Sequence, residues 1–298
     1  MSFYGLEIAK SALFVSQQGI QLSGHNIANA ATEGYTRQSL VMQAIDPASL
    51  AGRFASVSHN NVGKGVQSLY ITQIRNTYVD RALRKEYADL GQYNIRSDKM
   101  AYLEEMFDER KDTGVLAQLS EFINSMQELS GDTLSKEYRM AAQQSAVTLT
   151  KTFNHYYTQL SDLQSQMNDS MKVTVDSINT IVKSIAAYNK SIASYELNGD
   201  HANDLRDKRN LLLDELSTLV DITYSEDTEG KLSVKVGDTE VVSHTEYTQL
   251  QAVADQTGIV TGATGFYRVC VTDADGNLAE VSYSSGELAG YRQLRDGN

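Results

Sequence analysis

The sequence predicts a mainly α-helical fold with a β-rich insertion, in an elongated multidomain chain with long heptad helices. Three observations support this prediction. A seven-residue apolar repeat runs through the first thirty residues, a longer repeat covers residues 157–195, and short strand-like segments separated by turns fill residues 221–284. Heptad spacing predicts helices that pack along their length, whereas short β-rich runs between turn residues predict a small sheet.

The composition fits a folded chain with long helices. The 298 residues are enough for two or three domains, and 41% hydrophobic and 21% charged residues are close to ordinary globular usage. Pro47 is the single proline, and tryptophan is absent. Because an interior proline breaks a helix, its near absence favours uninterrupted helices. Cys270 is the single cysteine, which leaves no intrachain disulfide.

The charge balance argues against two classes of partner. The 26 basic and 38 acidic residues give a formal net charge of -12, which repels nucleic-acid phosphates and anionic lipid. We therefore expect no nucleic-acid partner and no membrane partner. The first thirty residues lack the basic and apolar regions of a secretory signal peptide. This fits a cytoplasmic protein, or one exported by a machine that reads another signal.

Residues 1–35 form the first predicted unit, an N-terminal coiled-coil helix. Large apolar and small residues alternate along it in two seven-residue series. The eight candidate interface residues are Leu6, Ala9, Leu13, Ser16, Ile20, Ser23, Ile27 and Ala30. Small side chains let another helix approach closely, so this seam predicts a helical partner. The alternative is a buried helix of an ordinary domain.

Residues 36–75 are predicted to form a connector of strands and loops. Gly34 ends the preceding helix as a left-handed cap or turn residue. Strands are expected at residues 40–42 and 66–74, and Pro47 interrupts the segment between them. The connector therefore joins the first helix to the longer helical region.

Residues 76–220 are predicted to form a helical rod domain, which residues 285–298 rejoin. Helical spacing covers residues 79–107, 116–126 and 205–219. The chain ends within the last helical segment, which we interpret as an incomplete protein.

The longest predicted helix, residues 157–195, gives the strongest pattern in the sequence. Its stripe is apolar except at Gln164 and Thr174 and consists of Tyr157, Leu160, Gln164, Met167, Met171, Thr174, Ile178, Ile181, Ile185, Tyr188, Ile192 and Tyr195. Such a helix is about 60 Å long, which is natural for a rod. We expect Ile181 and Ile185 to lie in the core, and the helix to end near Asn198 and Gly199.

Residues 221–284 are predicted to form a small β-rich insertion domain. Short segments rich in β-branched and aromatic residues alternate with turn clusters. The expected strands are residues 222–224, 232–236, 240–242, 266–271 and 280–283.

The sequence offers no catalytic constellation. Its five histidines are dispersed and form no metal-binding spacing with each other or with the cysteine. The densest polar group is His201, Asp204, Asp207 and Glu215, which we interpret as a solvated, salt-bridged helix face. We therefore expect no enzyme activity, no catalytic residues, no cofactor and no metal.

Two short stretches resemble a known family. Asn26, Ile27, Ala28, Asn29 and Ala30, followed by Gly34, Tyr35, Thr36, Arg37 and Gln38, are similar to the N-terminal motif of flagellar rod, hook and hook-associated proteins. The motif residues taken as diagnostic are Asn26, Ile27, Asn29, Gly34, Tyr35, Arg37 and Gln38. The ending Gly-Tyr-Thr-Arg-Gln resembles the first hook-associated protein family. Residues 114–130, 203–220 and 286–296 are similar to that family as well. Glu33 and Gly131-Asp132 depart from its usual turns.

This resemblance implies an elongated multidomain axial protein that joins the flagellar hook to the filament. It implies a ring of identical subunits, contact with the hook protein and with the next hook-associated junction protein, and an export chaperone. The location implied is the extracellular flagellum, reached without a cleaved signal peptide, and the N-terminal seam becomes an assembly interface.

Two other readings stay open at this level. A flagellar rod or hook axial protein would share the N-terminal helix but should lack the helix at 157–195 and the segment at 203–220. A secreted coiled-coil protein that binds surfaces, or an enzyme carried on such a scaffold, would use residues 221–284 as its binding module.

Overall fold

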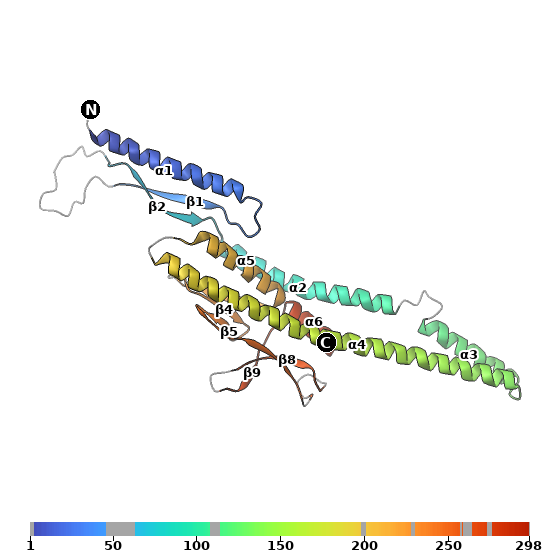
Figure 1. Ribbon diagram of the computed structural model, residues 1–298. Helices are drawn as coiled ribbons and strands as arrows, with labels where there is room; N and C mark the ends of the chain where they lie inside the picture. The colour runs from blue at the N-terminus through green and yellow to red at the C-terminus, as the bar shows by residue number, and fades with distance from the viewer. Residues whose placement is uncertain are drawn as a thin grey trace.

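The computed structural model describes an elongated molecule (Figure 1). The described residues are 3–45, 63–107, 114–197, 201–227, 230–256, 258, 264–272 and 276–297. One end consists of helix α1 and a two-stranded sheet, the middle consists of helices and β-strands packed on the long helix α4, and the other end is a hairpin of two helices. The predicted mainly α fold with a β-rich region is confirmed.

The N-terminal unit is one helix on a β-hairpin. Helix α1 (Phe3–Ala28) packs against antiparallel strands β1 (Gln38–Ala44) and β2 (Val66–Gln73), and it buries Val15 and Leu22 there. Both predicted strands are present. The expected interruption at Pro47 lies outside the described residues.

Gly34 has the left-handed backbone predicted for it, with φ of 74°. A side chain there would also be crowded, because an added Cβ would lie 3.2 Å from the Cβ of Leu211 on helix α5. Glycine is therefore favoured twice at this turn, by its backbone conformation and by close packing.

Three helices form the length of the molecule. Helix α2 (Thr77–Met106) is capped by Asn76, α3 (Val115–Gly131) follows, and α4 (Lys136–Glu196) runs back past both. With 61 residues, α4 is about 90 Å long. It begins 21 residues before the predicted start, at a cap made by Ser135, whose hydroxyl accepts from the Tyr138 N–H at 3.3 Å. The predicted end at Asn198 and Gly199 lies outside the described residues.

The apolar stripe of α4 is buried only in its middle. The buried members of the predicted stripe are Met167, Met171, Thr174, Ile178, Ile185 and Ile192. Ile181 is partly buried against the same core. Tyr157, Leu160 and Tyr195 are exposed. The stripe therefore forms a core over part of its length, and the half of α4 that pairs with α3 contributes little to it.

The remaining elements cover this middle part. Helix α5 (Asn203–Leu219) and helix α6 (Glu287–Asp296) lie along α4, as the spacing predicted. One buried cluster joins apolar side chains of these helices to Val234, Val242 and Val269 of the strands. The proposed domain boundary near residue 221 remains a prediction, and this shared core crosses it.

The β-rich region contains two antiparallel sheets. The first has the order β3-β4-β5-β6 and the second β7-β8-β9. The strands are β3 (Ile222–Glu226), β4 (Leu232–Val236), β5 (Thr239–Ser243), β6 (Glu246–Tyr247), β7 (Leu250–Ala254), β8 (Tyr267–Thr272) and β9 (Leu278–Glu280).

Four of these strands, β3, β4, β5 and β8, were predicted. Strands β6 and β7 were missed, and the segment expected at 280–283 pairs only at Glu280. Val281 and Tyr283 beyond it are buried by core contacts without belonging to a strand. The sequence of this buried, unpaired segment thus has the same apolar pattern as a strand.

Three asparagines on α4 fasten the strands to it. Asn179 accepts from the Leu250 N–H and donates to the Leu250 carbonyl, both at 2.8 Å, in the manner of a neighbouring strand. Asn189 donates to the carbonyls of His244 at 2.6 Å and of Leu232 at 3.2 Å. These side chains satisfy backbone groups that face the helix.

Asn168 makes the third of these contacts. Its Oδ1 accepts from the Tyr267 N–H at 2.7 Å and from buried Arg295 at 3.1 Å. The three asparagines are eleven and ten residues apart, which is about three helical turns in each case, so they lie on one face of α4. The strands are therefore held to the helix by both apolar and polar contacts.

The core position of the α4 stripe can be tested with a charge. Ile185→Asp is expected to lower the free energy of unfolding by several kcal/mol, because it places an unpaired carboxylate among apolar side chains. Lys183→Asp, on the exposed side of the same helix, should have little effect. Thermal or urea unfolding followed by circular dichroism measures both, and equal midpoints would show that the stripe is not buried.

Candidate functional site

The eight residues of the predicted seam are all exposed; seven lie on α1, and Ala30 lies in the turn that follows it. Leu6, Leu13, Ile20 and Ile27 are 60–77% exposed. The small members Ala9, Ser16, Ser23 and Ala30 are exposed as well. At about 100° per residue, the seam lies on the face away from Val15 and Leu22, which contact the hairpin. The helix therefore carries two apolar faces, of which the described part of the chain covers one.

Glycines on α1 give a related observation. An added Cβ at Gly5, Gly19 or Gly24 would meet no atom within 4 Å. Glycine in a helix costs about 1 kcal/mol relative to alanine. Packing within the described chain does not require these glycines, whereas close approach by another helix would.

The motif residues at the end of α1 converge on Asn26. Its Oδ1 accepts from the Tyr35 hydroxyl at 2.8 Å and from the Gln38 N–H at 2.9 Å, and its Nδ2 donates to the Gln38 carbonyl at 2.9 Å. The His25 Nδ1 lies 3.0 Å from the same hydroxyl. Because the tyrosine proton is directed to Asn26, the histidine must be the donor. This network fixes the turn between α1 and β1.

Other motif residues have different roles. The Asn29 side chain donates to the His25 carbonyl at 3.0 Å and accepts from Thr32 at 3.2 Å, which closes the end of the helix. The side chains of Ile27 and Arg37 are exposed. The structure thus brings Asn26, Tyr35 and Gln38 together and leaves those two side chains at the surface.

Asp207 of α5 holds the N-terminal unit from the other side. Its Oδ2 accepts from the Thr36 N–H at 3.0 Å, and its Oδ1 accepts from the Gln73 side chain at 2.8 Å. The carboxylate also lies 4.0 Å from the guanidinium of Arg75. Burial raises the pKa of Asp207 in spite of the hydrogen bond from Thr36 and the nearby Arg75.

Asn203 and Asp204 extend this contact. The Asn203 side chain donates to the Ile71 carbonyl at 2.9 Å, and its own carbonyl accepts from Gln73 at 2.9 Å. Asp204 accepts from the Gln38 side chain at 2.8 Å. We call Asn203, Asp204 and Asp207, with their partners on the N-terminal unit, the polar joint.

The polar joint corrects one prediction. His201, Asp204, Asp207 and Glu215 were expected to form a solvated face, but Asp207 is only 5% exposed. Arg209, on the same helix, is 1% exposed. The charges were recognised in the sequence, but the partners of Asp204 and Asp207 lie more than a hundred residues away and were missed.

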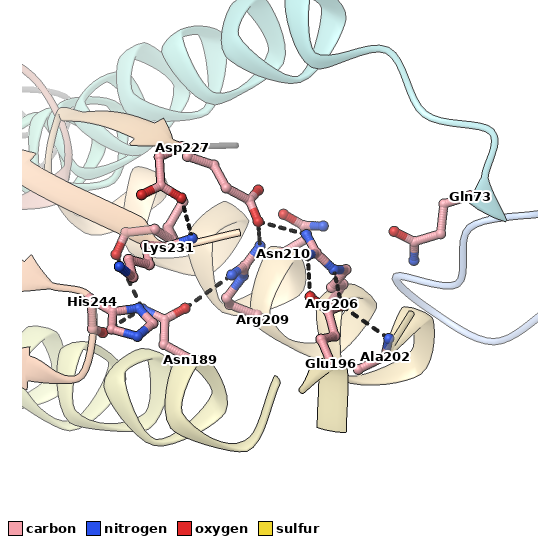
Figure 2. Close-up of polar contacts among 12 residues, drawn as sticks. Gln73, Asn189, Glu196, Ala202, Arg206, Arg209, Asn210, Asp227, Lys231 and His244 are labelled. Carbon is pink, nitrogen blue, oxygen red and sulfur yellow. Dashed lines mark hydrogen bonds and ion pairs between the residues drawn. The ribbon is translucent and has the colours of Figure 1, made fainter. Parts of the chain in front are cut away.

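The opposite side of α5 binds α4 and the first sheet through arginines (Figure 2). Arg206 donates to both carboxylate oxygens of Glu196 at 2.8 Å and to Glu226 at 2.6 Å. Arg209 donates to Glu226 at 2.9 Å and to Asn189 at 3.0 Å. These charge-assisted bonds connect α5 to β3 through Glu226 and to α4 through Glu196 and Asn189.

The pKa values follow from these contacts. Burial alone would raise the pKa of Glu196, but hydrogen bonds from Arg206 and from the Ala202 N–H lower it overall. The hydrogen bond to Glu196 raises the pKa of Arg206, while burial lowers that of Arg209. All three groups remain charged at neutral pH.

A cavity of about 280 Å³ lies beside the polar joint, between β2, α2, α5 and β3. Four arginines line it, namely Arg75, Arg84, Arg206 and Arg209. Each is ion-paired. Arg75 pairs with Asp80, and Arg84 pairs with Asp214. Arg206 pairs with Glu196 and Glu226, and Arg209 pairs with Glu226. The charges are therefore balanced within the chain, as in a structural joint.

The described parts of the chain offer neither a metal-binding cluster nor a membrane-spanning helix. These residues contain no group of three histidine, cysteine or carboxylate side chains that could hold a metal ion. Among the described helices, none is both long and apolar enough to cross a membrane. His59 lies outside the described residues.

Comparisons with known proteins agree on one family. The family model of the flagellar hook-associated protein FlgK helical domain matches residues 100–298. Flagellar hook-associated protein 1 of Bacillus subtilis strain 168 is 30% identical over 224 residues, which cover 75% of this chain and 44% of that protein. The fold resembles the flagellar hook junction protein FlgK from Burkholderia pseudomallei, with a TM-score of 0.61 and 20% identity over 73% of this chain and 38% of that one. The chain thus spans less than half the length of the relatives it matches.

The Asn26 network can be tested by truncation. Asn26→Ala leaves the Tyr35 hydroxyl and the Gln38 N–H without their acceptor. The cost is about 1–3 kcal/mol for the group of buried Gln38 and less for half-buried Tyr35, which water can reach. Hydrogen exchange should show faster exchange of the Gln38 amide. The same change at exposed Asn154 on α4 is the control and should leave this amide unaffected. Unchanged protection at Gln38 in Asn26→Ala would contradict the network.

The pair of Glu196 and Arg206 predicts an acid-dependent contribution to stability. Because folding lowers the pKa of Glu196, its contribution is present above the ordinary value of 4.5 and is lost as the pH falls through the lower folded value. Glu196→Gln should therefore melt below the unaltered protein at neutral pH, and this difference should shrink below pH 4.5. Glu215→Gln, at an exposed position of α5, is the control. A difference in melting temperature that stays constant with pH would argue against the pair.

Proposed function

The chain belongs to the FlgK family of flagellar hook-associated proteins, and on this basis we propose that it is part of a structural subunit that joins hook to filament. The subunit assembles with identical copies through α1. The family model covers two thirds of the chain, and the fold match extends the likeness to the helical body. The function of the whole protein is proposed because the chain spans less than half of its relatives.

The observation that supports assembly is the uncovered seam on α1. Four large apolar side chains stand in a row beside a row of small ones, on the face away from the hairpin. A contiguous exposed apolar surface of this kind is typical of a protein interface. Its heptad period matches a partner that is itself a helix.

The competing flagellar reading is less well supported. A rod or hook protein was expected to lack the long helix and the segment 203–220. Both lie within residues 100–298, the part matched by the family model. The match therefore favours the hook-associated protein over other axial proteins.

A surface-binding protein or enzyme is also less well supported. The strands of residues 221–284 are fastened to α4 by Asn168, Asn179 and Asn189 and share its core, which fits a structural role. The family is one of structural proteins, and we propose that this member has no catalytic activity.

The proposed partners follow from the family and the charge. We propose a ring of identical subunits, with the hook protein on one side and the next hook-associated junction protein on the other, and an export chaperone before assembly. Nucleic acid and membranes are not proposed, since the net charge of -12 opposes both. The proposed location is the extracellular flagellum, reached without a cleaved signal peptide.

The proposal is tested in cells. Loss of the parent protein should leave hooks without filaments and release flagellin into the medium, whereas loss of a rod or hook protein would stop assembly earlier. In the full-length protein, Ile20→Asp should abolish swimming, because it places a charge in the helix contact. Gln21→Asp, exposed on α1 but off the seam, should swim. Normal swimming by Ile20→Asp would refute the assembly role of α1, and normal filaments in the deletion strain would refute the junction role.

A further inference from the structure

The N-terminal unit has a single covalent connection to the rest of the described chain. Helix α1, β1 and β2 are contiguous in sequence, and only residues 74–76 lead from them into α2. The large buried cluster of the molecule contains no residue of this unit among those described. The orientation of the N-terminal unit relative to the rest of the described chain is therefore not set by this apolar core.

The contacts that do hold it are mostly polar and directional. They are the hydrogen bonds of the polar joint, the close packing of Gly34 on Leu211, and an edge contact between Tyr70 and His201. A hydrogen bond weakens steeply when its angle changes, whereas an apolar contact tolerates sliding. Contacts of this kind define an orientation.

Asp207 has the central place among them. It binds Thr36, which precedes β1, with one oxygen and Gln73, at the end of β2, with the other. The two partners lie at the joint end of both strands, so one carboxylate fixes two points of the hairpin. Two points prevent the rotation that a single bond would allow.

The local structure of α5 does not require this residue. Asp207 lies inside the helix, and its carboxylate accepts hydrogen bonds from Thr36 and Gln73 of the N-terminal unit. Burying a carboxylate is costly, and the pKa of Asp207 is raised accordingly. A costly buried group that bonds only across the joint indicates a role in geometry.

We propose that Asp207, supported by Asn203, is a positioning residue that sets the angle between helix α1 and the long helix α4. In a ring of identical subunits, every copy must present its α1 seam at the same angle for neighbouring helices to meet. This consequence for assembly rests on the proposed function, whereas the setting of the angle does not.

The angle can be measured with paired spin labels. Labels at Gln17→Cys on α1 and Lys183→Cys on α4 are both at exposed positions, and buried Cys270 is replaced by alanine. The otherwise unaltered protein should give one narrow distance distribution. Asp207→Ala should broaden it, because the N-terminal unit then turns about residues 74–76. Asp207→Asn keeps one acceptor oxygen and should lie between the two.

The control is Glu215→Ala, an exposed acidic position on the same helix, which should leave the distribution narrow. Circular dichroism should show that all variants keep their helices, so that a broad distribution reports the angle rather than unfolding. A narrow, unshifted distribution in Asp207→Ala would overturn the proposal.

A second measurement separates the two proposals. In cells, full-length Asp207→Ala should lose filaments, while Glu215→Ala should keep them. Broadened distances with normal filaments would overturn the consequence for assembly and leave the setting of the angle intact. Filaments in the strain that lacks the protein would overturn the junction role alone.

Discussion

The strands of the middle region can only dock on α4 if the backbone groups that face the helix find partners there. Three asparagines on one face of α4 meet this requirement, each contacting a different part of the β-rich region. Apolar side chains between them, such as Ile178 and Ile185, supply the burial. The face of α4 that forms this core therefore also fixes the register of the sheets against it.

Helix α5 connects this middle region to the N-terminal unit. Its arginines, Arg206 and Arg209, point to α4 and β3, and its acids, Asp204 and Asp207, point to the hairpin. The opposite charges lie on opposite sides of a short helix segment, so each side meets complementary groups. Charged and amide contacts through α5 thus link the orientation of α1 to that of the long helix α4.

Periodicity was enough to predict much of this fold. Helix α1, the strands β1 and β2, and helices α5 and α6 were all predicted from spacing and turn residues. The first 21 residues of α4 were missed because this part of the helix buries only Ala142 and so shows no apolar stripe. A helix that rests on one neighbour gives a weak pattern.

The polar contacts could not be predicted from one sequence. Asn168 and Asn189 were not singled out, because each adjoins the predicted stripe without belonging to it, and Asp207 was interpreted as a solvated charge. Thr36 and Asp207 are 171 positions apart, and no local spacing connects them. Their burial follows from topology, which the periodicity of separate helices does not define.

Helix α1 has low intrinsic stability and depends on contacts with other elements. Its three glycines lower its intrinsic stability, at about 1 kcal/mol each, and the hairpin covers only the face of Val15 and Leu22. The helix therefore depends on the hairpin on one side and, in the proposed assembly, on a partner helix on the other. Because the polar joint determines where the second face points, the residues that orient the helix and those that would bind the partner are separate. Substitutions in the joint and in the seam should thus act on different steps of one assembly reaction.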